Sequence, residues 1–423
     1  MLLFIAVENY RSLHERQELS LVPSSFYKEL RETLITCEGL PDRQLLPSAV
    51  IYGPNASGKS NLIAAMRWFQ TVVMQSHSKG KPDGGVPRHP FALSPSAKEE
   101  PTRIEIEFVL DGSRLRYGFE ASDTEFTSEW LVAFPNGRSQ VLFERTSAKK
   151  IKFGRTLKGQ NKVISELMRP NSLFLSAAVQ NGHEQLLPVH SYIAALAFDS
   201  SVSNVGPIAV RGEQLDARII EFLESIGTGV VGFRRRQVTR SPETDKFLKE
   251  LTALISNHTK APPEDIATPG DFVLELEHSS DGAEPVYFGL EDESEGTKRL
   301  LLILSSVFDA LDKGYPLFID ELDASLHTQV GDAILSLFAS RSSNPRGAQL
   351  IATTHDTNLM GSPCLRRDQI WFTEKDGRGA THLFPLSDIR TRNTDNIEKG
   401  YLQGRYGAIP FSGNFKSLVS AKH

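Results

Sequence analysis

The strongest chemical signal in the sequence is an eight-residue run that fits the pattern G-x-x-x-x-G-K-S: Gly53, Pro54, Asn55, Ala56, Ser57, Gly58, Lys59 and Ser60. In this pattern the glycines let backbone N–H groups curl around a triphosphate. The Lys59 ammonium would meet the β- and γ-phosphates, and the Ser60 hydroxyl would ligate magnesium. Asn61 follows at the start of a helix whose N-terminal dipole favours anions. We therefore predict an ATP site and prefer it to a plain glycine turn with a solvated lysine.

Two adjacent carboxylates, Asp320 and Glu321, follow the short apolar run 317–319. We predict that Asp320 holds magnesium, because acidic residues at strand ends do so in P-loop ATPases. Glu321 is placed to polarise the attacking water as a general base. On its own the run would equally suit an ordinary strand with an acidic turn, and only the P-loop upstream favours the catalytic interpretation.

Two further stretches have residue types suited to a phosphate site. His355 ends the apolar run 348–354, which we expect to lie beside the Asp320 strand. Ligands meet the carboxyl ends of parallel strands, so His355 is predicted to reach the γ-phosphate, although a lone histidine is more often structural. Ser294-Glu295-Gly296-Thr297 precedes a long apolar helix and suits either an anion site or a simple helix cap.

These residues need a scaffold that brings them together, and the apolar periodicity predicts one. Strands are expected at 1–7, 19–22, 48–52, 171–180, 315–319 and 348–354, with helices after Lys59, at 298–311 and at 325–339. Strands that alternate with helices indicate a parallel core sheet. Residues 102–146 alternate in hydrophobicity around turns at 111–112 and 136–137 and predict an antiparallel meander. Residues 184–260 are expected to be mostly helical, and a further hairpin is expected to turn at 281–282.

The predicted fold class is therefore α/β, with a mostly parallel core sheet, an antiparallel β subdomain and a helical insert. We expect an N-terminal core lobe with the P-loop at 1–100, the inserted meander and helical subdomain at 101–290, and a C-terminal core lobe at 291–423. A chain with 39% hydrophobic and 23% charged residues can bury a large core.

Composition narrows the class of protein further. A net charge of -5 does not suit a dedicated nucleic-acid coat. The only two cysteines, Cys37 and Cys364, are isolated, which excludes a disulfide framework or a cysteine metal site and favours a reduced cytosol. The N-terminus lacks the parts of a signal peptide, and no apolar run approaches the ~20 residues that span a bilayer. A cytoplasmic protein without membrane contact is expected.

Taken together and in this order, the motifs resemble those of the ABC-type ATPases rather than the ring-forming AAA+ motors. Asp320 to Asp323, continued by 324–327, looks like Walker B running into a D-loop, and 354–355 resembles the H-loop. Residues 294–297 look like a degenerate ABC signature that has Glu295 in place of the second glycine. The resemblance implies that Ser294, Gly296 and Asp323 contact nucleotide and that Gln180 is a Q-loop ligand of magnesium.

The opening VENYRSLHE is similar to the N-terminus of chromosome-maintenance and recombination ATPases, where an arginine such as Arg11 lies by the nucleotide. Nearly the whole chain, including the tail 395–410, resembles a bacterial family of compact ATPases linked to abortive infection and restriction (RloA/AbiLi-like). In this class the signature of one subunit faces the P-loop of another. The resemblance thus implies a homodimer or higher homo-oligomer that sandwiches ATP and magnesium.

The family often works with a separately encoded effector, typically a nuclease and in some cases one with a Toprim-like fold. An ATP-driven switch in anti-phage defence is therefore the expected function. The stretch after His355 is short for a nuclease domain and contains no metal-binding set of carboxylates. The alternative is a DNA-repair or chromosome-type ATPase that binds nucleic acid directly, with candidate phosphate contacts at 234–236, Arg240 and 149–150. A transporter subunit is a weaker reading, because the P-loop and the signature stand far apart.

Overall fold

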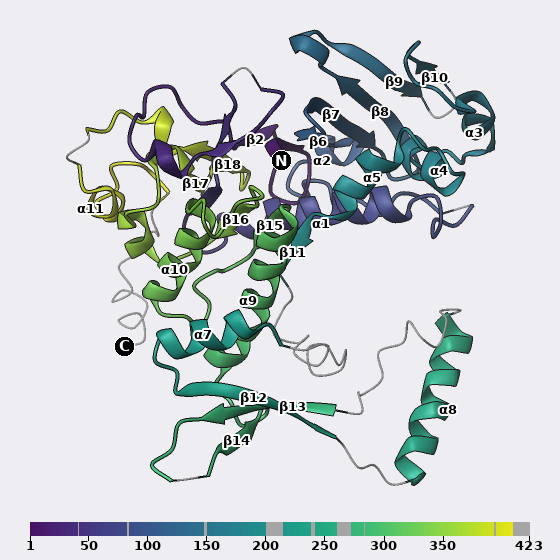
Figure 1. Ribbon diagram of the computed structural model, residues 1–423. Helices are drawn as coiled ribbons and strands as arrows, with labels where there is room; N and C mark the ends of the chain where they lie inside the picture. Colours follow the sequence, from purple (N-terminus) through teal and green to yellow (C-terminus); the bar gives the residue numbers. More distant parts are fainter. Residues whose placement is uncertain are drawn as a thin grey trace, which may run out of the picture. The chain divides into compact units, whose positions relative to one another are not determined.

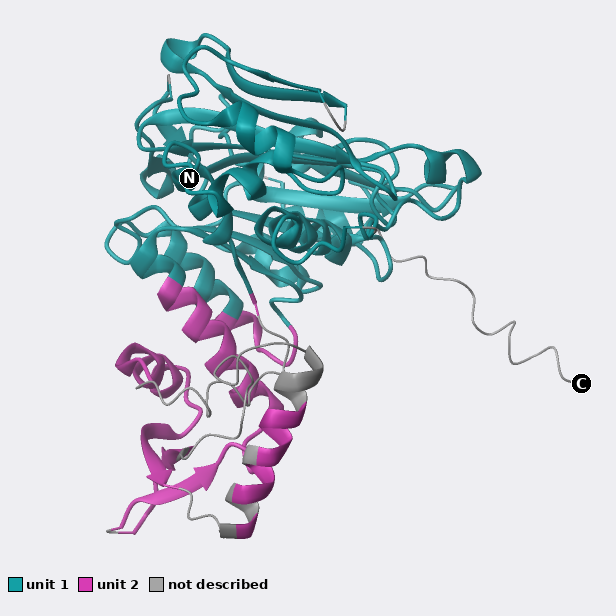
Figure 2. Ribbon diagram, turned by 90° about the vertical axis from the view of Figure 1, so that its right-hand side faces the viewer, with its two compact units in different colours: residues 1–198, 310–323, 331–423 teal, residues 199–309, 324–330 magenta. Residues whose placement is uncertain are grey.

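A computed structural model describes residues 1–40, 42–82, 84–147, 150–199, 215–237, 242–259, 272–282, 284–392 and 395–408. The chain divides into two compact units (Figure 2). Unit 1 comprises Met1–Phe198, Ala310–Asp323 and Gly331–His423, and unit 2 comprises Asp199–Asp309 and Ala324–Val330.

Unit 1 contains the predicted parallel core sheet. Its six strands run in the order β11 (Ala197–Phe198), β15 (Pro316–Ile319), β16 (Gln349–Thr353), β5 (Ser48–Tyr52), β17 (Ile370–Lys375) and β18 (Thr381–Pro385). All neighbours are parallel except β17 and β18. Every residue of β5, β15 and β16 is buried, as expected for strands covered on both faces.

The second sheet of unit 1 is antiparallel and contains the predicted meander. Its order is β10 (Lys150–Phe153), β9 (Gln140–Ser147), β8 (Phe126–Ala133), β7 (Ser113–Ala121), β6 (Thr102–Leu110), β1 (Leu2–Glu8) and β2 (Gln17–Ser20). The predicted turn at Asp111 and Gly112 is confirmed, with φ of 49° and 70° at these residues. The N-terminal strand β1 pairs with β6, so the meander continues a sheet that begins at the start of the chain.

Helix α1 (Lys59–Gln75) contributes to the core that the two sheets share. Its buried residues recur at helical spacing, among them Leu62, Met66 and Phe69. Phe69 stacks on Phe119 of the antiparallel sheet with ring centroids 5.6 Å apart. Ile51 of the parallel sheet belongs to the same buried cluster. Because burial of each such side chain is worth roughly 1.5–3 kcal/mol, this packing fixes the helix that follows the P-loop.

The other helices of unit 1 are α2 (Pro95–Glu99), α3 (Asn161–Leu167), α4 (Phe174–Gln180), α5 (Leu187–Ala194), α10 (Thr328–Ala339) and α11 (Ile397–Leu402) (Figure 1). α10 also includes residues of unit 2. In the tail, Tyr401 of α11 stacks on Phe372 of β17 with centroids 5.4 Å apart. The Tyr401 hydroxyl donates to the Ala408 carbonyl at 2.8 Å. The described part of the tail therefore packs against the core sheet.

The strand predicted at 171–180 is wrong, because residues 174–180 form the helix α4. The reason is Glu129 of β8, which is fully buried. Its carboxylate accepts hydrogen bonds from the backbone N–H groups of Phe174 at 2.5 Å and Leu175 at 3.0 Å. It thereby satisfies the first donors of a helix that the apolar run alone does not reveal.

The segment 184–260, which we predicted to be mostly helical, is helical over most of its described residues, including α5 of unit 1. It contains α7 (Ala217–Ser225) and α8 (Pro242–Thr259), but between them lies the strand β12 (Val230–Gln237). β12 pairs with β13 (Phe272–His278), which pairs with β14 (Val286–Gly289), and the hairpin predicted around 281–282 is confirmed. Arg234 and Arg236 of β12 pair with Glu275 on the neighbouring strand β13. α9 (Glu295–Lys313) follows and contributes residues to both units.

Candidate functional site

The P-loop connects β5 to α1, and its glycines occupy backbone conformations that other residues avoid. Gly53 has a φ of 156° and Gly58 a φ of 106°. A Cβ atom on Gly58 would overlap the Thr381 hydroxyl and lie 2.7 Å from that of Ser12. Both the backbone geometry and the close approach therefore require glycine at position 58. Ala56 also has a positive φ of 62°, so the loop curls tightly between its two glycines.

The side chain of Lys59 is enclosed by the loop that precedes it. Its Nζ donates to the carbonyl oxygens of Gly53 at 2.8 Å and Pro54 at 3.1 Å, and the residue is only 5% exposed. Burial lowers the pKa of Lys59, and the charges of Asp320, Asp323 and Glu321 act in the opposite direction. The predicted Walker B carboxylates thus lie near enough to Lys59 to influence its ionisation.

Arg11, Ser57 and Asn61 meet in one hydrogen-bonded group at the start of α1. Asn61 Nδ2 donates to the Ser12 hydroxyl at 2.6 Å, and Arg11 Nη1 lies 3.5 Å from Asn61 Oδ1. Ser57 is buried, whereas Asn55 and Ser60 are exposed. The sequence-predicted Arg11 is therefore next to the P-loop, with its guanidinium exposed.

Three residues that support the loop were missed by the sequence analysis: Ser12, Thr373 and Thr381. The Thr381 hydroxyl donates to the Ser57 carbonyl at 2.6 Å, and the Thr373 and Ser57 hydroxyls are 2.7 Å apart. Thr373 and Thr381 belong to β17 and β18, far away in sequence, and single threonines on strands give no signal of their own. Ser12 directly follows Arg11, and this adjacency is the only signal in the sequence that could have indicated its role beside the P-loop.

The strand order brings the P-loop, Asp320 and His355 to one edge of the core sheet. β16 lies between β15 and β5, with Ile319 opposite Ala352 and Thr353 opposite Ile51. All three strands are parallel, so their carboxyl ends meet at the same edge. Neighbouring strands are ~4.8 Å apart, which places the ends of β15 and β5 about 10 Å apart. This distance is within the reach of one magnesium triphosphate.

Thr353, at the end of β16, forms hydrogen bonds with both Asp320 and Glu321. Its hydroxyl donates to Asp320 Oδ1 at 2.6 Å and accepts from the backbone N–H of Glu321 at 2.8 Å. Glu321 has a φ of 55°, a conformation that carries backbone strain for a residue other than glycine. The side chain of Glu321 is exposed beyond this strained turn.

Asp323 ties the turn after β15 to the turn after β16. Its Oδ1 accepts from the Thr354 hydroxyl at 2.8 Å and from the backbone N–H of His355 at 3.0 Å. Within one chain, Asp323 thus positions His355, whose side chain is exposed.

Gln180 is not among the residues gathered at the P-loop. Its helix α4 is tied to the other end of α1, where the Ser176 hydroxyl accepts from His77 N and the Ser76 hydroxyl accepts from Leu173 N, both at 3.2 Å. α1 is about 25 Å long, and α4 would span only about 10 Å of that length. The assignment of Gln180 as a magnesium ligand does not fit this geometry, because the run that carries it is a helix and not a strand ending at the site.

Ser294 and Gly296 belong to unit 2, whereas the P-loop belongs to unit 1. Ser294 caps α9, since its hydroxyl accepts from the Thr297 N–H at 3.1 Å. A Cβ atom on Gly296 would lie 2.9 Å from the Ser325 carbonyl oxygen, so a side chain there would force a shift. Just before the cap, Glu293 pairs with His278 at 2.6 Å, which anchors the segment to β13.

Two of the candidate phosphate-binding arginines on β12 share one carboxylate partner, which offsets only part of their charge. Arg234 and Arg236 both pair with Glu275, at 2.7 Å and 2.5 Å. These contacts hold the pKa of Glu275 below its usual value. Arg240 and Lys149 lie outside the described residues, and Lys150 is exposed.

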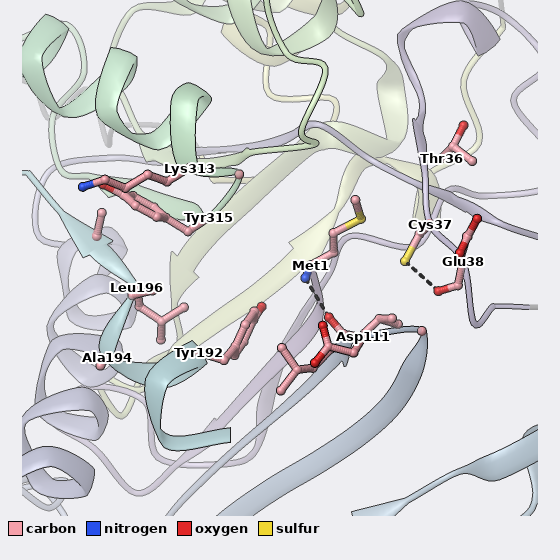
Figure 3. A pocket seen from close by; sticks show the side chains of 16 residues that line it. Met1, Thr36, Cys37, Glu38, Asp111, Tyr192, Ala194, Leu196, Lys313 and Tyr315 are labelled. Carbon is pink, nitrogen blue, oxygen red and sulfur yellow. Dashed lines mark hydrogen bonds between the residues drawn. The ribbon is translucent and has the colours of Figure 1, made fainter. Parts of the chain in front are cut away.

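A separate hollow of about 830 Å³ lies in unit 1, and none of the P-loop residues line it (Figure 3). Met1, which precedes β1, and Tyr315, which precedes β15, line its wall together with Tyr192 and Lys313. Tyr315 stands at the opposite end of β15 from Asp320. This hollow is therefore not the nucleotide site.

The donor set at the P-loop fits a magnesium triphosphate. Gly53 and Gly58 leave no space for a side chain, Lys59 is held inside the loop, and the Ser60 and Asp320 side chains supply the hard oxygens that magnesium prefers. No cluster of three or more His, Cys, Asp or Glu side chains suited to a metal occurs in the described part of the chain. A magnesium ion bound together with substrate phosphates does not need such a cluster, since phosphate oxygens and several water molecules complete its coordination.

Comparison with known proteins assigns the chain to a family. A family model described as "AAA domain, putative AbiEii toxin, Type IV TA system" matches residues 48–361, a span that includes the P-loop, Asp320, Glu321 and His355. The chain belongs to this family. This match confirms the resemblance to P-loop ATPases of the ABC type that the motifs indicated. The α/β fold class predicted for this AAA domain protein is also confirmed.

Two solved structures are similar to this AAA domain protein at low identity. The SMC head domain from Thermotoga maritima has 14% identity and a TM-score of 0.39, with 91% of this chain and 98% of that chain covered. The recombination mediator protein RecF has 16% identity and a TM-score of 0.34, with the same coverage. TM-scores this low carry no argument about function. No curated protein matches the sequence significantly. In the described ranges, no helix is both long and apolar enough to cross a membrane.

Proposed function

We propose that this protein hydrolyses ATP with magnesium and acts as the ATP-driven switch of an anti-phage, abortive-infection system that includes a separately encoded effector, a nuclease. The observation that supports the ATPase part is the strand order β15-β16-β5, because it unites residues from positions 53–60, 320–321 and 355 at one sheet edge. Phosphoryl transfer depends on such positioning more than on covalent chemistry.

Each residue of the site has a proposed task. The P-loop N–H groups and Lys59 bind the β- and γ-phosphates, while Ser60 and Asp320 hold magnesium, which when bound neutralises charge that develops on the phosphates. Glu321 orients a water molecule and accepts its proton. His355, held by Asp323, contacts the γ-phosphate side of the pocket. Thr353 positions the carboxylate of Asp320 and the backbone of Glu321.

We further propose that a homodimer or larger homo-oligomer completes the pocket. Each chain has one P-loop and one signature-like segment, 294–297, and these belong to different compact units. In the ABC-type class that the motifs resemble, Ser294 and Gly296 would reach the nucleotide of a second copy. Since a nucleotide favours the state that binds it better, assembly would depend on ATP.

The defence role is supported by the description of the family, which names a toxin of a toxin–antitoxin system. A direct test is to measure plaque formation in cells that carry this chain together with its neighbouring gene. We expect protection that is lost with either gene alone and with Lys59→Ala. Steady-state ATP turnover of the purified chain tests the enzymatic part separately, and turnover no faster than in a Lys59→Ala control would contradict it.

Direct action on nucleic acid is the second candidate function. On β12, Glu275 pairs with both Arg234 and Arg236 and offsets one of their two positive charges, which weakens the support for phosphate contacts there. A salt series of duplex binding would distinguish the two functions, because an affinity that falls steeply with salt is the signature of phosphate contacts.

A further inference from the structure

The chain carries its positive charge unevenly, and one stretch lacks carboxylates altogether. Between Glu144 and Glu166 the sequence contains seven lysines and arginines and no aspartate or glutamate, although the whole chain has a net charge of -5. One of the seven, Arg145, is buried and donates to the carbonyls of Pro170 and Ser172, both at 2.8 Å. Lys149 lies outside the described residues. The other five we call the basic strip: Lys150, Lys152, Arg155, Lys158 and Lys162.

All five side chains of the basic strip are exposed, and none forms an ion pair with a residue that the structure describes. The strip runs from β10, at the edge of the antiparallel sheet, through the following loop into α3 (Figure 1). The carboxylates nearest to it in the chain or in the adjoining hollow are Glu144, Glu166 and Glu184, fewer than its five cations. Glu144 stands opposite Lys152 in the β9–β10 register, and Glu166 follows on α3. Positive charge therefore dominates this surface.

Protection of the sheet edge against pairing with other chains explains only some of the cations in the basic strip. Lysines on an edge strand discourage pairing with other chains, and Lys150 and Lys152 on β10 serve that purpose. Arg155, Lys158 and Lys162 come after the strand, in the loop and in α3, where no sheet edge needs protection. A ligand with negative charge would give these three cations a common role.

Next to the strip lies a hollow of about 720 Å³ with an apolar wall. Val163 and Leu167 of α3 line it and are 51% and 69% exposed. They are four residues apart, so they share one face of the helix. Lys158, Glu184 and the buried His183 also line the hollow. Single exposed apolar residues are ordinary on a protein surface. Here two of them share one helix face, and they lie beside both a hollow and a row of cations without ion-pair partners. This combination indicates a binding surface.

We propose that the basic strip and this hollow are a docking site for a short acidic segment of a partner protein, with two apolar side chains that pack against Val163 and Leu167. The distribution of charge favours an acidic peptide segment over nucleic acid as the ligand. Salt screens charges beyond about 8 Å, so a short segment meets mainly the basic strip, whereas a long polyanion would also lie close to other surfaces of a chain whose net charge is -5. The exposed apolar side chains of Val163 and Leu167 would also gain nothing from contact with phosphate groups.

We take the partner to be the effector of the proposed function, and only that choice rests on the proposed function. The surface itself does not depend on ATP turnover. Its test therefore uses no nucleotide, so that failure of the docking site and failure of the ATPase can be told apart.

The test measures fluorescence anisotropy of a labelled peptide of about twelve residues, glutamate-rich and with two leucines four residues apart, on the full chain. We expect binding that weakens about fivefold or more in the charge-reversal pair Lys158→Glu and Lys162→Glu, since several surface ion pairs at ~0.2–1 kcal/mol each multiply to that size. Leu167→Ser, at an exposed position that does not endanger folding, should also weaken binding. The control pair Lys28→Glu and Lys98→Glu changes net charge equally at exposed sites elsewhere and should stay within about twofold.

Three results would overturn the proposal. The first is equal affinity in the strip pair and the control pair. The second is equal affinity for a peptide with serine in place of both leucines, which would leave the apolar wall without a role. The third is tighter binding of a duplex of about 20 base pairs than of the peptide, with the same loss in the strip variants, which would make the surface a nucleic-acid contact. Thermal unfolding of each variant shows that it is folded.

Discussion

Thr353 and Asp320 are joined across two parallel strands by a 2.6 Å hydrogen bond from the threonine hydroxyl to the carboxylate. The same hydroxyl accepts from the N–H of Glu321. One oxygen atom thus positions both the predicted magnesium ligand and the predicted general base.

Thr353→Val should keep the shape of the side chain and remove both hydrogen bonds. We expect ATP turnover to fall about tenfold, corresponding to roughly 1.4 kcal/mol, because Asp320 and Glu321 lose their common support. Thr127→Val, whose hydroxyl makes one long bond within the antiparallel sheet, is the matched control. Equal turnover in the two variants would show that Thr353 has only a packing role.

Lys59→Ala should abolish tight ATP binding. The ammonium is expected to exchange its bonds to Gly53 and Pro54 for charge-assisted bonds to phosphate, worth roughly 1.5–3 kcal/mol each, so affinity should fall about 100-fold. Equilibrium binding of a fluorescent ATP analogue measures this, with the exposed Lys98→Ala as control. Unchanged affinity would remove the P-loop assignment.

Glu321→Gln should bind ATP with normal affinity but lose turnover by about 10²–10⁴-fold, since the amide cannot accept the proton of the water. With hydrolysis blocked, the nucleotide-bound assembly should accumulate, which size-exclusion chromatography with and without ATP would detect. Turnover within a few-fold of wild type would mean that another residue is the base.

ATP binding should be accompanied by proton uptake at alkaline pH. Burial lowers the pKa of Lys59 below its usual 10.5, so the free protein loses this proton at a lower pH than an exposed lysine would. The triphosphate adds negative charge and raises that pKa, so the lysine takes up a proton on binding. Calorimetry in two buffers of different ionisation enthalpy measures the uptake, which should shrink towards pH 7.5. Uptake that is independent of pH would contradict a titrating Lys59.

The buried carboxyl of Glu129 should make stability depend on pH. Burial raises its pKa above the ordinary 4.5, so the folded protein binds the proton more tightly than the unfolded chain. The stability from this group is complete below pH 4.5 and is lost as the pH rises through the folded pKa. Relative to Glu129→Gln, wild type should therefore lose unfolding free energy as the pH rises from 4.5, which thermal melts at several pH values measure. A constant difference would show that Glu129 does not titrate in this range.

The P-loop, the Asp320–Glu321 pair and His355 could be predicted from the sequence because each ends or begins an element with a strong apolar pattern. The parallel sheet follows from the same patterns, since fully buried strands read as continuous apolar runs. The meander could be predicted because its turns, such as 111–112, use residues that tolerate positive φ.

Only the tertiary structure decided which distant residues support these motifs. Thr353, Thr373 and Thr381 reach the site through strand order, and single threonines carry no local signal. The helix at 174–180 forms because Glu129, on another element, accepts its first N–H groups. Gln180 consequently ends a helix and not the strand that we expected. Local sequence encodes the periodicity of an element, but the contacts that override it come from residues that are distant along the chain.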